Sequence, residues 1–132
     1  MSQPDLHGIW TLVDFSFEDP GGGMRRVPMQ GRLHYLHGGL MSAHLMSGAL
    51  SAEDEDTAGG FRPVSYCGAW HVDGDTVRHT VELASVRAWI GSELARRIVW
   101  DGDTLVLIAE RARLEDMTGT ARLSWVRAGE DA

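Results

Sequence analysis

The stretch His71-Val72-Asp73-Gly74-Asp75-Thr76-Val77 places a tight Asp-Gly turn between two runs of alternating residues. Val99-Trp100-Asp101-Gly102-Asp103-Thr104-Leu105 repeats this pattern, and Tyr35-Leu36-His37-Gly38-Gly39-Leu40 supplies a third glycine turn. Such turns join neighbouring antiparallel strands. The sequence therefore predicts consecutive hairpins, which leave two open edges unless the sheet curls shut.

We expect eight strands and no long helix. The expected strands cover residues 8–18, 31–37, 40–46, 66–72, 76–84, 92–100, 103–110 and 120–127. Residues 19–29 and 111–119 are expected to be loops, and the acidic stretch 47–65 is long enough for a lid or binding loop. Sequential hairpins favour one all-β domain over residues 1–132, folded as an eight-stranded antiparallel up-and-down β-barrel. A two-sheet sandwich fits the same number of strands.

Composition limits the kinds of partner that the protein can have. The net charge of -7 argues against a nucleic-acid partner and against docking on an anionic membrane. No apolar run reaches membrane-spanning length, and residues 1–8 do not resemble a signal peptide, so we expect a cytoplasmic protein. All 12 basic residues are arginine, which excludes a lysine-anchored cofactor. The single Cys67 has no internal disulfide partner, and we interpret it as a small buried strand residue.

Alternation along each strand predicts which side chains face the interior, because residues i and i+2 share a face. Strand 76–84 has one apolar face, and strand 92–100 has a face on which an arginine lies among apolar residues. Strand 40–46 is ambiguous, because both of its faces are plausible inner faces. The predicted inner sets are Val77, His79, Val81 and Leu83; Leu94, Arg96, Ile98 and Trp100; and either Met41, Ala43 and Leu45 or Leu40, Ser42, His44 and Met46.

The expected lining has an apolar, aromatic wall with a few polar points, which is typical of a small-molecule site. Its polar points are Tyr35, Tyr66, His79 and Arg96, and its wall residues are Trp70, Trp89 and Trp125. A buried arginine needs an acceptor, which could be a tyrosine hydroxyl, a backbone carbonyl, Glu110 or a ligand. The leading hypothesis is that the barrel binds a small, mostly apolar molecule, with no cofactor.

Two other hypotheses stay open. The first is a cofactor-free isomerase, cyclase or dehydratase acting on a polyketide-like or other carbonyl compound. In it His79 is the acid or base, while Arg96 and a tyrosine such as Tyr66 hold an oxyanion. The second is a structural or partner-binding barrel with a packed interior. A homodimer could form through the outer face, where we expect Phe15 or Phe17 to be exposed.

The remaining histidines raise the question of a metal site. His34 and His44 are expected to face each other across the first hairpin, with His37 at its tip and His71 elsewhere. No His-x-His pattern or nearby set of carboxylates completes a zinc or iron site. We therefore expect no metal.

Several short motifs follow one another along the chain: Gly8-Ile-Trp10-Thr-Leu12, Gly31-Arg-Leu-His-Tyr35, Gly39-Leu-Met-Ser42, Tyr66-Cys-Gly68, Val77-Arg-His79, Trp89-Ile-Gly91, Arg96-Arg97 and Leu123-Ser-Trp125-Val-Arg127. In this order they make the chain resemble the lipocalin-like domain family found in many bacterial and fungal proteins. The resemblance implies an antiparallel barrel around a small-molecule cavity, with Trp10 plugging the closed end and Arg127 packed near it. The chain departs from the family pattern at Ala88, where a proline is expected, and at Thr80, where a second histidine often follows the first. The family has no settled reaction.

Overall fold

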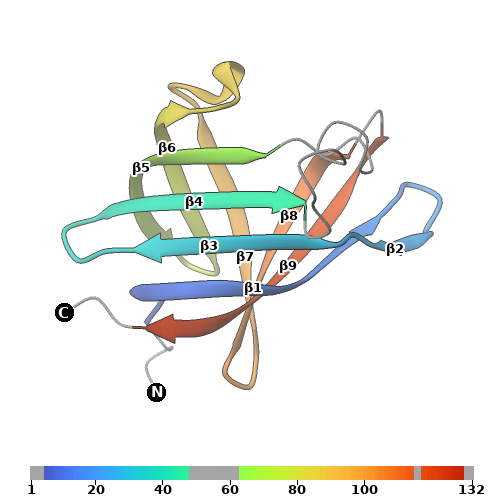
Figure 1. Ribbon diagram of the computed structural model, residues 1–132, viewed down its shortest axis with the longest axis horizontal. Helices are drawn as coiled ribbons and strands as arrows, with labels where there is room; N and C mark the ends of the chain where they lie inside the picture. The colour runs from blue at the N-terminus through green and yellow to red at the C-terminus, as the bar shows by residue number, and fades with distance from the viewer. Residues whose placement is uncertain (1–4, 48–62, 115–116, 130–132) are drawn as a thin grey trace.

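The computed structural model describes residues 5–47, 63–114 and 117–129, most of which lie in strands (Figure 1). Within these residues nine strands and one short 3-10 helix follow in chain order. They are β1 Gly8–Glu18, β2 Met24–Arg26, β3 Met29–Tyr35, β4 Leu40–Ser47, β5 Val64–Asp73, β6 Thr76–Ala84, η1 Arg87–Trp89, β7 Glu93–Asp101, β8 Thr104–Leu114 and β9 Met117–Gly129. No helix in the described part of the chain is long and apolar enough to cross a membrane.

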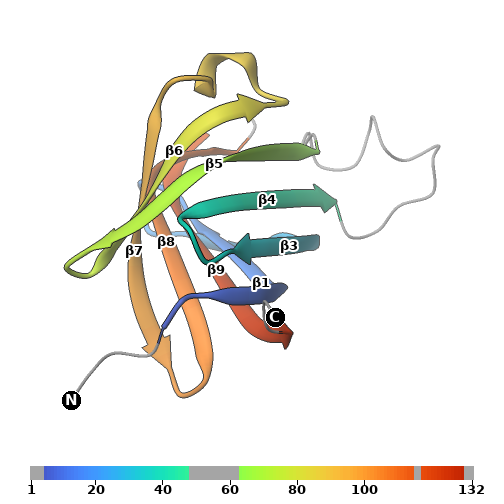
Figure 2. The same cartoon turned by 90° about the vertical axis from the view of Figure 1, so that its left-hand side faces the viewer.

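The strands form one antiparallel sheet in the order β2-β1-β3-β4-β5-β6-β7-β8-β9, and β1 also pairs with β9. That last pairing extends from Ile9 opposite Gly129 to Glu18 opposite Thr120, and it closes eight strands into a barrel (Figure 2). β2 is an additional strand that pairs with the far end of β1. The predicted eight-stranded antiparallel up-and-down barrel is confirmed.

The two Asp-Gly turns have the backbone that their sequence predicts. Gly74 (φ 64°) joins β5 to β6, and Gly102 (φ 60°) joins β7 to β8. Both glycines occupy the left-handed region, which other residues adopt only with strain. Glycine in these turns therefore sets where each strand ends and its partner begins.

The loops expected at 19–29 and 111–119 are only partly loops. Residues 24–26 form β2, which the sequence did not predict. β8 and β9 continue far into the second segment and form a long hairpin, with an irregularity between Ala109 and Ala112 where Arg111 has a positive φ of 59°. Most of the predicted 47–65 loop, residues 48–62, lies outside the described residues, so its role as a lid stays a prediction.

A bulge in β1 corrects the prediction for Phe15 and Phe17. The pairing of β1 with β9 shifts between Leu12 and Asp14, so Val13 is the extra residue and is 56% exposed. The shift keeps Leu12 inside and also turns both phenylalanines inward, where they are 6% and 1% exposed. The expected exposure of Phe15 or Phe17 as a dimer contact is therefore wrong.

A second bulge corrects the prediction for Leu83. The pairing of β5 with β6 shifts between Cys67 and Gly68. Val77, His79 and Val81 face the interior as expected, but Leu83, beyond the shift, is 66% exposed. In a strand one extra residue moves every following side chain to the opposite face.

The inner face of β4 is the one that carries Met41 and Ala43. Both are buried, whereas Leu40 and Met46 of the other face are 57% and 42% exposed. The ambiguity left by the sequence is resolved in favour of the set of Met41, Ala43 and Leu45. Met41 pairs with Tyr35 on one side and with Gly68 on the other, so this face continues the inner walls of β3 and β5.

Trp10 and Arg127 fasten the N-terminal segment to the barrel. The Trp10 indole is buried and donates from Nε1 to the Leu6 carbonyl over 2.7 Å. The Arg127 guanidinium lies 4.3 Å from the Trp10 ring centroid and donates to the carbonyls of His7 and Asp5. A cation over an indole face is attracted by the ring quadrupole. Arg127 thus packs on Trp10, as the family resemblance implies.

Candidate functional site

His79 of β6 meets two tyrosine side chains inside the barrel, one from β3 and one from β5. The Tyr35 hydroxyl of β3 lies 2.6 Å from His79 Nε2, and the Tyr66 hydroxyl of β5 lies 2.7 Å from Nδ1. His79 itself is 2% exposed, Tyr35 is 0% exposed and Tyr66 is 7% exposed. Both ring nitrogens therefore have a hydrogen-bond partner, and the cluster Tyr35–His79–Tyr66 is a buried polar group on the inner wall.

Burial keeps this cluster uncharged. Desolvation, with a smaller contribution from the positive charge of Arg96, lowers the pKa of His79 to about 3. Burial also raises the pKa of Tyr66 above its usual value, and the pKa of Tyr35 further still. At neutral pH the imidazole and both phenols are therefore neutral hydrogen-bonding groups.

Two tryptophans pack against the tyrosines. The ring centroids of Trp70 and Tyr35 are 4.7 Å apart, and Trp89 meets Tyr66 edge to face at 5.7 Å. Trp70 is fixed in orientation because its Nε1 donates to the Leu36 carbonyl over 3.0 Å. The polar cluster is thus bordered by aromatic surface on both sides.

The bulge between β5 and β6 lies in β6, where Glu82 is the extra residue opposite the Cys67–Gly68 step. A Cβ atom at Gly68 would collide with the backbone carbonyl of Thr80 on β6, so only glycine permits this close approach of the two strands. Beyond the bulge Tyr66 pairs with Ala84, and its side chain points inward. The Tyr66-Cys-Gly68 motif therefore serves the site through its backbone as well as through its hydroxyl.

The connection from β6 to β7 places Trp89. The turn η1 ends at Trp89, and Gly91 (φ 84°) then donates its backbone N–H to the Val81 carbonyl. Val81 in turn donates to Ser92, which ties the turn back onto β6. The backbone therefore holds the indole beside Tyr66.

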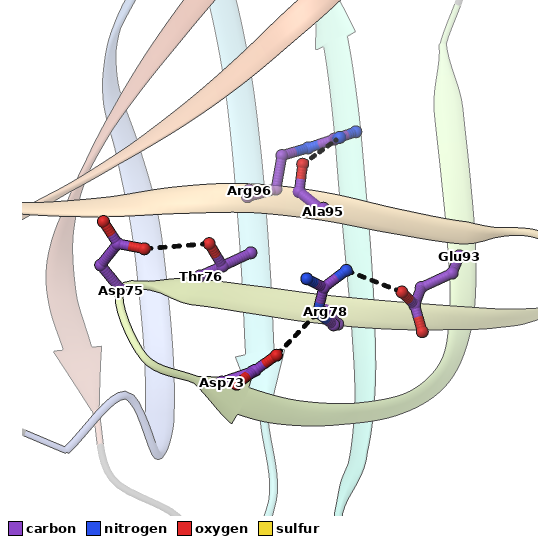
Figure 3. A network of polar contacts seen from close by, with 7 residues as sticks. All are labelled: Asp73, Asp75, Thr76, Arg78, Glu93, Ala95 and Arg96. Carbon is purple, nitrogen blue, oxygen red and sulfur yellow. Dashed lines mark hydrogen bonds and ion pairs between the residues drawn. The ribbon is translucent and has the colours of Figure 1, made fainter.

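Arg96 lies on the inward face of β7 but not in direct contact with the cluster. β7 alternates strictly between exposed and half-buried residues, and Arg96 belongs to the half-buried set. Among the described residues its guanidinium donates to the backbone carbonyl of Ala95 over 3.1 Å (Figure 3). Of the acceptors considered from the sequence, a backbone carbonyl is the one observed. Arg96 influences His79 through its charge, across space.

The charged residues on the outside of the same strands form separate pairs. Arg78 Nη1 lies 2.9 Å from Glu93, and Arg78 Nε lies 3.5 Å from Asp73 (Figure 3). Glu110, suggested above as a partner for Arg96, is exposed and lies 3.7 Å from Arg97 instead. Exposed ion pairs of this kind contribute little to stability. Glu110 as an inward partner of Arg96 is therefore wrong.

Trp125 faces the interior from a different part of the wall. It lies on β9, opposite Leu105 of β8 and Leu12 of β1, and β9 is four strands from β5 in either direction around the barrel. Its indole is 2% exposed, and its Nε1 has no hydrogen-bond partner among the described residues. The structure thus brings Tyr35, Tyr66, Trp70, His79 and Trp89 together and places Trp125 on the opposite wall.

Four of the other five histidines form two ring contacts, His34 with His44 and His7 with His37. His34 on β3 and His44 on β4 are diagonal neighbours, with ring centroids 6.2 Å apart. The Nδ1 atom of each contacts a serine hydroxyl. His37 stacks on His7 at 3.3 Å between centroids. In the part of the chain that the structure describes, no group of three or more potential ligands could hold a metal ion.

A crevice in the outer wall, of about 500 Å³, was not predicted from the sequence. It is lined by residues of β1, β3, β4 and the start of β5, among them Leu12, Arg32, His44 and Ser65. β1 pairs with β3 only from Gly8 to Thr11, so the two strands separate beyond this point.

A closed up-and-down barrel with a polar cluster on its inner wall defines a small β-barrel of the lipocalin type. The chain belongs to the lipocalin-like domain family, whose model matches residues 7–128. Among solved structures, an uncharacterized protein from Bacteroides eggerthii DSM 20697 is similar, with a TM-score of 0.43 and 13% identity over 89% of this chain and 98% of that chain. No curated protein matches the chain significantly.

Proposed function

We propose that the protein binds a small, mostly apolar molecule in the barrel interior, against the Tyr35–His79–Tyr66 cluster. The observation that carries this proposal is a neutral, buried cluster of polar groups set in an aromatic wall. Ligand sites in proteins combine apolar walls with a few placed polar groups, and this is the combination found here. Trp70 and Trp89 supply the apolar surface next to the cluster.

The neutrality of the cluster determines what kind of molecule it suits. A buried ionised group demands a counter-charge, whereas neutral hydroxyl and imidazole groups need only hydrogen-bond partners. The pKa of about 3 for His79 keeps the imidazole uncharged at neutral pH. An uncharged molecule with an apolar body and one or two polar atoms is the ligand that fits this chemistry.

A second candidate function is catalysis by a cofactor-free isomerase, cyclase or dehydratase on a carbonyl compound. The charge of Arg96 favours it, because this charge opposes the rise that burial causes in the pKa of both tyrosines. The same field would stabilise an oxyanion that develops near a tyrosine hydroxyl. The low pKa of His79 leaves the imidazole unprotonated at neutral pH, so a tyrosine hydroxyl is the better proton donor in this scheme.

Native mass spectrometry of the purified protein, followed by identification of released small molecules, tests the binding proposal. We expect one molecule bound per chain, and a large loss of occupancy in His79→Gln. Thr80→Ala is the matched control, because Thr80 is the next residue on β6 and is exposed on the outer face. Equal occupancy in all three proteins would place the ligand elsewhere and contradict the proposal.

A turnover assay on the identified molecule then separates binding from catalysis. Conversion at a rate that falls in Tyr66→Phe more than affinity does would favour the enzyme. Loss of affinity without any conversion by the unaltered protein would favour a binding protein.

A further inference from the structure

The hydrogen atoms of the cluster identify which group faces the ligand. A neutral imidazole carries one N–H donor and one nitrogen acceptor. Each tyrosine hydroxyl carries one hydrogen, so the two contacts to His79 require one tyrosine to donate and the other to accept. The accepting tyrosine keeps its own hydroxyl hydrogen, and this hydrogen is directed at neither nitrogen of the ring.

Two arrangements satisfy this count. In the first, His79 Nδ1–H donates to the Tyr66 oxygen, and the Tyr35 hydroxyl donates to Nε2. In the second, Nε2–H donates to the Tyr35 oxygen, and the Tyr66 hydroxyl donates to Nδ1. The arrangements differ in which tyrosine holds the spare hydroxyl hydrogen: Tyr66 in the first and Tyr35 in the second.

Burial distinguishes the two arrangements. Tyr35 is 0% exposed, and among the described residues its hydroxyl contacts only His79. A spare hydrogen there would be buried without an acceptor, which is costly. Tyr66 is 7% exposed and borders Trp89, which closes the connection between β6 and β7. Tyr66 is the less buried of the two tyrosines, so a spare hydrogen costs less there and the first arrangement is favoured.

We propose that His79 carries its proton on Nδ1 and that the Tyr66 hydroxyl donates a hydrogen bond to an acceptor oxygen of the bound molecule, a carbonyl in the simplest case. This inference rests on the proposed binding function and names the chemical class of its ligand. Tyr66 is then the contact residue. Tyr35 is a positioning residue, because it fixes the tautomer of His79 by donating to Nε2.

Nitrogen-15 NMR of the imidazole tests the tautomer in the ligand-free protein. We expect a protonated Nδ1 and an unprotonated Nε2 for His79, with the signal assigned by its loss in His79→Gln. A protonated Nε2 would overturn the inference. The measurement does not involve a ligand, so it can fail or succeed independently of the proposed binding function.

Two matched probes test the ligand class: 2-acetylnaphthalene, which has a carbonyl, and 2-isopropylnaphthalene, which replaces it with an apolar group. One hydrogen bond makes the ketone bind about three- to tenfold more tightly, measured by quenching of tryptophan fluorescence. We expect Tyr66→Phe to abolish this preference, Tyr35→Phe to weaken it because the tautomer of His79 is no longer fixed, and Thr80→Ala to retain it.

The outcomes point to different conclusions. Equal binding of both probes to the unaltered protein would overturn the donor role of Tyr66. A preference that survives in folded Tyr66→Phe, with circular dichroism as the check on folding, would do the same. Binding of neither probe would count against the proposed binding function and the ligand-facing role together, whereas the tautomer would still be decided by NMR.

Discussion

Replacing His79 with glutamine should make the protein less sensitive to acid, because His79 is buried without a charge. Burial, assisted by Arg96, lowers its pKa to about 3 in the folded protein, whereas the usual value is 6.5. Between these two values the unfolded chain binds a proton that the folded protein does not. The free energy of unfolding therefore falls as the pH falls through this window, and it is unaffected by His79 above the upper value.

The size of the effect follows from one proton. Each pH unit inside the window costs about 1.4 kcal/mol, so lowering the pH from 7 to 5 should cost about 2 kcal/mol through His79 alone. The pKa of both tyrosine partners is raised, so neither titrates in this range. The remaining histidines and carboxylates titrate in both proteins, and comparison with the variant removes their contribution.

Urea denaturation followed by tryptophan fluorescence measures the free energy of unfolding at both pH values. The unaltered protein should lose about 2 kcal/mol more than His79→Gln between pH 7 and pH 5. The variant starts from a lower stability, because the two tyrosines lose an imidazole partner. Equal losses in the two proteins would show that His79 is not buried in its neutral form, and the reasoning about the cluster would fail with it.

Gly68→Ala should destabilise the barrel by about 1–3 kcal/mol or prevent folding, because the added Cβ would meet the Thr80 carbonyl, and a urea midpoint close to that of the unaltered protein would contradict this. Arg127→Met should lower the free energy of unfolding by about 1–2 kcal/mol, because the cation–π contact and two hydrogen bonds to the N-terminal segment are lost. Amide hydrogen exchange in that segment should become faster, and unchanged exchange would refute the prediction. Leu83→Ser should change the free energy of unfolding by less than about 0.5 kcal/mol, because the side chain is exposed, whereas Val81→Ser on the inner face should lower it by at least about 2 kcal/mol. Similar losses in both variants would contradict the position of the bulge between these two residues.

The hairpins were predictable because their signal is local. An Asp-Gly pair between two alternating runs determines a turn within a few residues, and Gly74 and Gly102 both lie in such turns. Sequential hairpins then leave few ways to arrange the strands, so the barrel followed from the turns. The length of the β8–β9 hairpin was not predictable, because its strands continue through a segment that has little alternation.

The two bulges were not predicted, because alternation along a strand does not show where an extra residue is inserted. Val13 in β1 and Glu82 in β6 each change which face the following residues occupy, and a reading by alternation carries the error forward to Phe15, Phe17 and Leu83. The extra residue is fixed by the register with the partner strand, which for Val13 is the distant β9. Gly68 was a signal in retrospect, because a glycine inside a strand is typical of a bulge or a close backbone approach.

The site was predicted as a set of inward polar residues but not as a set of contacts. Alternation alone placed Tyr35, Tyr66 and His79 on inner faces, and all three are buried. That they form hydrogen bonds depends on the stagger of three strands, which the sequence does not reveal. Arg96 was placed on the correct face, but its interaction with the cluster is electrostatic rather than a direct bond.

The pairing of β1 with β9 also affects how the chain is made. Both strands contribute to a single seam, yet the ribosome delivers β1 first among the barrel strands and β9 last. Until β9 emerges, one edge of β1 offers unpaired backbone groups to any other extended chain nearby. Such distant pairing is slow to form, so this edge of the nascent chain stays open to aggregation until β9 arrives.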